Sequence, residues 1–130
     1  MGVVTGNPRF AKPVVLVVDD EPFQQRSLAR VFRDLEVHIA SGAREALELI
    51  RGGLKPDVVL SDIRMPEGTG VDLKTWLTRD HPSLLDRLVF MTAFGPEGAE
   101  AVLPHVTLKK PLTEHDIRNV RQRATDNAEA

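Results

Sequence analysis

Five short apolar runs, separated by segments with helical spacing, constrain the fold of this chain more than any other feature. We expect strands at 14–18, 36–40, 57–60, 87–91 and 106–108. The first run, Val14–Val18, is almost entirely β-branched, as in strands that are covered on both faces. Regular alternation of strand and helix predicts an α/β fold, a doubly wound parallel sheet with helices on both faces.

The segments between the strands carry apolar residues at helical spacing. Pro22 suits the first turn of a helix, and Gly52-Gly53 and His81-Pro82 are expected to end the second and third helices. Thr113 and Asp116 predict a capping box at the last helix, whereas Pro96 and Pro104 confine the fourth to a stub. The expected core-facing positions are Leu28, Val31, Phe32, Leu35, Ala43, Ala46, Leu47, Ile50, Leu73, Trp76, Leu77, Ile117, Val120 and Ala124.

The length of 130 residues predicts one domain over 13–125, with a flexible leader at 1–12 and a frayed tail at 126–130. A net charge of −2 gives no general field for nucleic acid, and no apolar run has the roughly 18 residues that membrane insertion needs. The chain has no cysteine, which excludes disulfides and thiolate metal sites. A cytoplasmic location fits this composition.

Polar residues stand where four of the expected strands end: Asp19, Asp20, Asp62, Thr92 and Lys110. The carboxyl ends of parallel strands meet at one edge of the sheet, where ligands bind. Three carboxylates there would repel one another unless a hard cation such as Mg²⁺ joined them. Lys110 and Thr92 suit phosphoryl oxygens, and a carboxylate can form an acyl phosphate. The residues therefore predict phosphoryl transfer to an aspartate, with the isolated Asp62 as the nucleophile.

Four stretches in order carry a family resemblance: VLVVDDEP, VVLSDIRMPEGTG, FMTA and LKKP. Over about residues 13–125 the chain resembles a CheY-like response-regulator receiver domain of two-component signalling. This resemblance implies a flavodoxin-like sheet of five strands in the order 2-1-3-4-5.

The resemblance also implies a role for each site residue. Asp62 would be the phosphoacceptor, and Thr92 and Lys110 would bind the phosphoryl group. Mg²⁺ would be held by Asp20 directly, by Asp19 largely through water, by Asp62 and by the backbone carbonyl of Arg64. The implied partner is a cognate sensor histidine kinase or phosphotransfer domain, with no direct contact to nucleic acid or membrane. Such a domain catalyses only its own phosphorylation and dephosphorylation, so we do not expect an enzyme.

Two features depart from the family pattern. Receivers usually carry an aromatic residue three positions before the lysine, where this chain has Thr107, and the segment from Thr92 to Lys110 is short. We therefore expect the switch to act through the loop at 93–97, with little effect on the last helix, and at most a weak homodimer. The shortened fourth helix resembles that of receivers attached to hybrid sensor kinases, and this resemblance favours such an origin. Sequence names neither the cognate kinase nor the downstream effector.

Other interpretations remain open. Each site residue alone could be a helix cap or a surface group, and an unphosphorylated pseudo-receiver would keep the fold. A flavodoxin-type binder would need a hydroxyl-rich phosphate loop after the first strand, where this chain has Asp19-Asp20-Glu21. A haloacid-dehalogenase-like phosphatase would need D-x-D there, and the P-loop motif is absent. Trp76 is interpreted as a residue that packs its helix against the core. The arginines of the last helix are interpreted as a solvated helix face. The histidines without ligand spacing are His38, His81, His105 and His115.

Overall fold

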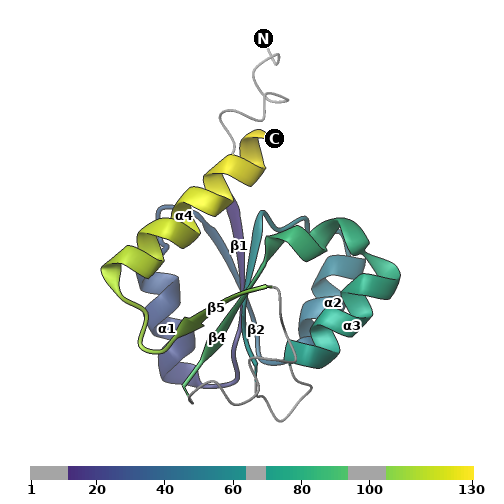
Figure 1. Cartoon of the computed structure of the whole chain (residues 1–130), viewed down its shortest axis with the longest axis horizontal. Coiled ribbons are helices and arrows are strands. Elements are labelled where there is room, and N and C mark those ends of the chain that lie inside the picture. The colour runs from purple at the N-terminus through teal and green to yellow at the C-terminus, as the bar shows by residue number, and fades with distance from the viewer. Residues whose placement is uncertain (1–11, 64–69, 94–104) are drawn as a thin grey trace.

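The computed structural model describes residues 12–63, 70–93 and 105–130. Its centre is a five-stranded parallel sheet in the order β2-β1-β3-β4-β5 (Figure 1). This is the order that the family resemblance implied. The strands are β1 Val14–Val18, β2 Glu36–Ala40, β3 Val58–Asp62, β4 Leu88–Thr92 and β5 Val106–Lys109.

Helices cover both faces of the sheet, with α1 and α4 on one side and α2 and α3 on the other (Figure 1). The helices are α1 Pro22–Val31, α2 Ala43–Arg51, α3 Gly70–Asp80, the 3-10 helix η3 Pro82–Arg87 and α4 Glu114–Glu129. The label α4 therefore belongs to the last helix of the chain. The short helix expected at about 96–103 lies outside the described residues.

The alternation of side chains along β1 builds two separate cores. On one face, Val15 and Val17 pack with Leu28 of α1, with Phe32 directly after that helix, and with Val120 of α4. The side chains between them on β1 point to the opposite face and pack with those of α2 and α3, including Leu47, Leu73 and Leu77. Because both faces of a parallel sheet are buried, β1 has no polar residue before Asp19.

Capping side chains set where two helices begin. The Thr113 hydroxyl accepts from the backbone N–H of Asp116 at 3.0 Å, and the Asp116 carboxylate accepts from that of Thr113 at 2.9 Å. This reciprocal pair confirms the predicted capping box at α4. At α1, the Glu21 carboxylate accepts from the N–H of Gln24 at 2.7 Å, next to Pro22 in the first turn.

Several boundaries differ from those predicted by the sequence. The third and fourth strands extend through Asp62 and Thr92, because the parallel ladder continues to the pair Asp62 and Met91. α1 ends at Val31, and the predicted core residues Phe32 and Leu35 are buried in the turn that follows. The 3-10 helix η3 after Pro82 was not predicted.

The C-terminal segment differs from the expected frayed tail, because α4 continues through Asp126 to Glu129. The Asn127 amide donates to the carbonyl of Asp57 at 2.8 Å, which ties this end of the helix to the loop before β3. The predicted leader lies almost entirely outside the described residues. Among the residues that are described, no helix combines the length and apolar character that crossing a bilayer requires.

Candidate functional site

The sheet brings the predicted residues together at one edge. Strands β1, β3, β4 and β5 are consecutive neighbours, and their carboxyl ends carry, in that order, Asp19-Asp20, Asp62, Thr92 and Lys110. Parallel pairing places these ends side by side: Val18 lies opposite Ser61, and Thr92 lies opposite Lys109. All five predicted side chains therefore belong to this edge.

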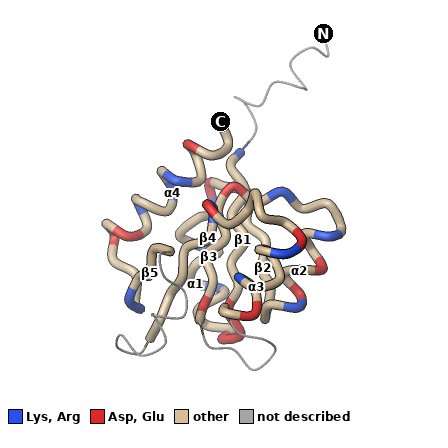
Figure 2. The backbone as a smooth tube through the Cα atoms, turned by 45° about the vertical axis from the view of Figure 1, so that its right-hand side comes forward, with Lys and Arg blue, Asp and Glu red and all other residues tan. Residues whose placement is uncertain are grey.

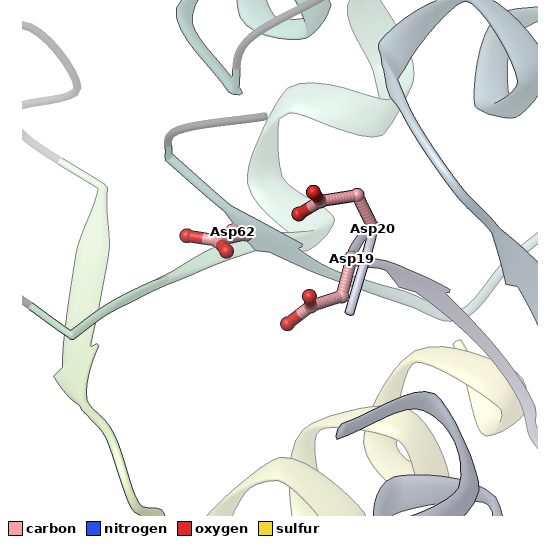
Figure 3. A group of neighbouring side chains, drawn as sticks. All are labelled: Asp19, Asp20 and Asp62. Atoms are coloured by element: carbon pink, nitrogen blue, oxygen red, sulfur yellow. The ribbon is translucent and has the colours of Figure 1, made fainter. Parts of the chain in front are cut away.

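Three carboxylates form an acidic cluster there. Oxygen atoms of Asp19, Asp20 and Asp62 lie within 4.8 Å of one another, and Figure 3 shows the side chains extending from the ends of β1 and β3 to the same side. Asp19 is fully buried, Asp62 is half-buried and Asp20 is exposed. Like charges this close repel in a partly dehydrated setting. The cluster therefore needs a positive charge.

Lys110, the residue directly after β5, supplies one positive charge. Its Nζ donates to the Asp19 carboxylate at 2.7 Å and to the Asp62 carboxylate at 2.9 Å. Burial acts to lower the pKa of Lys110, but the hydrogen bonds and charges of the two aspartates outweigh it, so the pKa is raised. Lys110 is therefore a fixed cation that bridges both acidic strand ends. Lys109, by contrast, is exposed, and no bond joins it to the acidic cluster among the described residues.

Asp19 is held by further contacts that the sequence did not reveal. Its carboxylate accepts from the backbone N–H of Glu21 at 3.0 Å. The Gln25 amide donates to the Asp19 carbonyl at 2.6 Å and to the Ser41 hydroxyl at 3.2 Å. Gln25 lies in α1 and Ser41 follows β2, so their meeting depends on tertiary packing that no local motif signals.

Backbone hydrogen bonds tie the end of β4 both to Lys110 and to the residue after Asp62. The N–H of Lys110 donates to the carbonyl of Thr92 at 2.8 Å, and that of Ile63 donates to Met91 at 3.1 Å. Thr92 is half-buried as the last residue of β4. This geometry places the Thr92 backbone beside the segment that carries Lys110.

Gly70, the first residue of α3, lies against the end of β3. The predicted carbonyl ligand Arg64 lies outside the described residues. Gly70 donates its N–H to the carbonyl of Ile63 at 2.8 Å. A Cβ at this position would lie 2.7 Å from the carbonyl oxygen of Asp62 and 2.9 Å from the ring of Phe90. A residue without a side chain is therefore required at Gly70, a constraint that the sequence showed only as a loop glycine.

The predicted switch position lies on β5. Thr107 pairs in register with Phe90, and its buried hydroxyl has no hydrogen-bond partner among the described residues. Phe90 also makes an edge-to-face contact with His105, with ring centroids 5.7 Å apart. The predicted response of the loop at 93–97 falls almost entirely outside the described residues and stays a prediction.

The structural roles predicted for Trp76 and the histidines agree with the described residues. The solvated face predicted for the arginines of the last helix is wrong for Arg121, which is half-buried and donates to the carbonyl of Val31 at 2.8 Å, because α4 packs against the end of α1. Trp76 packs against the core of α2 and α3. His38 contacts Glu36 at 2.8 Å, and His115 contacts Asn119 at 3.1 Å. Within the described ranges, the only group of side chains with metal-ligand geometry is the aspartate cluster, so none of the four histidines belongs to one.

The donors of the acidic cluster fit a hard divalent cation. All three side chains offer carboxylate oxygens, which Mg²⁺ prefers, and the exposed Asp20 leaves one side open to water. Neither a nitrogen nor a sulfur ligand is part of this group. The arrangement can therefore hold Mg²⁺ beside a carboxylate that is itself fixed by a lysine.

Known proteins share sequence similarity with most of this chain. The profile of the response regulator receiver domain matches residues 15–121. The positive alginate biosynthesis regulatory protein of Pseudomonas aeruginosa is 36% identical over 119 residues, which cover 85% of this chain and 46% of that protein. The transcriptional regulatory protein BtsR of Escherichia coli is 35% identical over 106 residues, covering 77% of this chain and 43% of that protein. The chain therefore spans less than half the length of these relatives.

A solved structure shows the same fold. The response regulator receiver domain protein from Clostridium thermocellum superposes with a TM-score of 0.75 over 89% of this chain and 96% of its own, at 24% sequence identity. This likeness agrees with the strand order β2-β1-β3-β4-β5.

Proposed function

This chain belongs to the response regulator receiver domain family, and on that premise we propose that it accepts a phosphoryl group on Asp62 in a His-Asp phosphorelay. Receiver domains are signalling domains of two-component systems. The observation that carries the proposal is the double contact of Lys110 with the Asp19 and Asp62 carboxylates, at 2.7 and 2.9 Å. The same ammonium can pair with a phosphoryl oxygen once Asp62 carries the group.

In the proposed transfer, an Asp62 carboxylate oxygen attacks phosphorus in line with the leaving nitrogen of phosphohistidine. The new bond is O–P, the bond that breaks is N–P, and its electron pair stays on the imidazole nitrogen. Lys110 balances charge on the phosphoryl oxygens, and the Thr92 hydroxyl donates to another of them. Asp62 is the proposed acceptor because it ends the central strand β3, between the acidic pair that follows β1 and the lysine that follows β5.

A magnesium ion bound at this edge would supply positive charge to the transferred group. Asp19, Asp20 and Asp62 would hold it, as their spacing and oxygen donors allow. The Arg64 carbonyl stays a proposed further ligand. Asp20 is the exposed member of the cluster, and we propose that it binds the ion directly while the buried Asp19 acts largely through water.

The proposed phosphoryl donor is a sensor histidine kinase or a phosphotransfer domain, in the cytoplasm. The proposed output is a change of conformation read by an effector. We propose no catalytic turnover beyond phosphorylation and dephosphorylation of the domain itself. The proposed module covers 13–125.

Incubation with acetyl phosphate tests this proposal without knowledge of the kinase. We expect the intact mass of the wild-type protein to rise by one phosphoryl group when Mg²⁺ is present, and to stay unchanged in excess EDTA. Asp62→Asn is expected to stay unlabelled in both conditions. Asp20→Asn is expected to fold and to lose labelling through weaker Mg²⁺ binding.

The outcomes separate the alternatives. An unlabelled wild-type protein that binds Mg²⁺ by calorimetry would favour a pseudo-receiver that signals without phosphorylation. Equal labelling of wild type and Asp62→Asn would show that the acceptor is another residue. Steady release of phosphate from added phosphate esters would instead favour an aspartyl-phosphate phosphatase.

A further inference from the structure

A groove of about 630 Å³ lies between the C-terminal end of α1, with the turn that follows it, and the N-terminal half of α4, outside the acidic edge. These helices lie side by side on one face of the sheet (Figure 1). Arginines line the groove from both sides: Arg30 from the end of α1, Arg33 from the turn that follows it, and Arg118 and Arg121 from α4. In the sequence, the arginines of each segment look like part of a solvated helix face. The fold brings the two groups of arginines to opposite sides of one groove.

The charge of this groove is opposite to that of the chain. Its four guanidinium groups face two carboxylates, Asp34 and Glu114, in a protein whose net charge is −2. Arg121 already pairs with Asp34 at 3.1 Å. Arg30 and Arg118 are exposed and have no side-chain ion pair among the described residues. Both charges are therefore available to a partner. Figure 2 shows that α4 carries both signs of charge along its length, whereas the groove beside α1 is lined by four arginines and two acidic residues.

The groove is held in shape by Arg121. Its guanidinium donates to the carbonyl of Val31 at 2.8 Å and lies 5.8 Å from the centre of the Phe32 ring. These contacts tie α4 to the end of α1. Val31 and Ile117, both partly buried, give the groove apolar surface between the arginines. A partner would therefore meet an apolar surface and an arginine, Arg121, that are already held in place, whereas Arg30 and Arg118 would be ordered on binding.

We propose that this groove docks an acidic amphipathic helix of a partner protein. An apolar stripe on such a helix matches Val31 and Ile117, and carboxylates on its flanks match Arg30 and Arg118. Arginine suits this role because its planar group binds a carboxylate through two hydrogen bonds. Asp34 and Glu114 stand within the same groove and would repel a continuous phosphate backbone, which favours a peptide over nucleic acid.

The test uses the whole chain and a synthetic fluorescent peptide of about four helical turns, with leucines along one stripe and glutamates on its flanks. Binding is measured by anisotropy, and the site is located by changes in the amide NMR spectrum. We expect saturable binding that weakens as salt rises, with shifted amides in the second half of α1 and the first half of α4. Arg30→Glu and Arg118→Glu should each weaken binding by at least about fivefold.

Arg44→Glu is the matched control, because Arg44 is an exposed helix arginine on α2, away from the groove, and changes the net charge by the same amount. It should change affinity by less than about twofold. The proposal is overturned if this control weakens binding as much as Arg118→Glu, or if a peptide with glutamine in place of leucine binds equally well. It also fails if duplex DNA binds more tightly than the peptide and loses affinity through the same arginines, which would make the groove a polyanion site.

This test is independent of phosphorylation. None of Asp19, Asp20, Asp62, Thr92 and Lys110 lines the groove. We therefore expect Arg118→Glu to be labelled by acetyl phosphate as fully as the wild-type protein.

Discussion

Replacing Lys110 with methionine removes the cation that bridges two acidic strand ends while keeping a side chain of similar length. In the folded protein the Lys110 side chain is 15% exposed, and those of Asp19 and Asp62 are 1% and 14% exposed. Without the ammonium, two carboxylates stay in a largely dehydrated site with no positive partner from β5. Removing one partner of a buried ion pair costs about 3–5 kcal/mol. Asp19 keeps the N–H of Glu21, so we take the lower value, about 3 kcal/mol.

Urea unfolding in EDTA measures this cost directly. With a slope of about 1.5 kcal/mol per molar urea, 3 kcal/mol lowers the midpoint by about 2 M. Added Mg²⁺ should recover more stability in Lys110→Met than in the wild-type protein, because the cation replaces the missing charge at the carboxylates. A ligand at 100 times its dissociation constant contributes about 2.7 kcal/mol, so saturating Mg²⁺ should restore most of the loss.

Lys109→Met is the control, because Lys109 is the exposed last residue of β5 and the direct chain neighbour of Lys110. Its midpoint should move by less than about 0.5 M. The reasoning is refuted if Lys110→Met loses less than about 1 kcal/mol in EDTA, or if Mg²⁺ stabilises it no more than the wild-type protein.

Three further substitutions test neighbouring contacts by urea unfolding. Gly70→Ala places a methyl group against the carbonyl of Asp62 and the Phe90 ring, so it should destabilise the fold by about 1–3 kcal/mol and slow labelling by acetyl phosphate; unchanged stability would contradict the packing at this turn. Thr107→Val removes a buried hydroxyl that has no partner among the described residues, so it should stabilise the fold by about 1 kcal/mol, and a loss would show that this hydroxyl is satisfied. Burial, and then the charge of Lys74, lowers the pKa of His105 from 6.5 against the opposing effect of Asp86. The unfolded chain therefore binds more protons just below that value, and stability falls as the pH drops through it. The urea midpoint should fall further between about pH 7.5 and about pH 5.5 in the wild-type protein than in His105→Gln, and parallel pH profiles would contradict this.

Much of the fold followed from local patterns. β-branched runs predicted the strands, and the alternation with helices predicted a parallel sheet whose carboxyl ends meet at one edge. Asp62 and Lys110 could be placed together because strand ends in such a sheet are neighbours, although 48 residues separate them in sequence. The sequence indicated which residues meet at the edge, but not the two short bonds by which Lys110 bridges Asp19 and Asp62.

What escaped prediction depends on contacts between distant elements. The ladder with β4 carries β3 through Asp62, and Asn127 holds the end of α4 by a bond to the carbonyl of Asp57. Gln25 reaches Asp19 only because α1 packs beside the end of β1. The arginine groove exists because α1 and α4 share a face of the sheet. None of these contacts is signalled by a hydrophobic period or a motif spacing in the sequence.

The most direct test of the central claim identifies the modified residue itself. After incubation with acetyl phosphate and Mg²⁺, borohydride reduces an acyl phosphate on aspartate to homoserine, which tandem mass spectrometry locates in a peptide. We predict homoserine at position 62 and nowhere else, with none in a sample treated in EDTA. Homoserine at Asp19 or Asp20, or an unmodified Asp62 in a protein that has gained a phosphoryl group, would contradict the account.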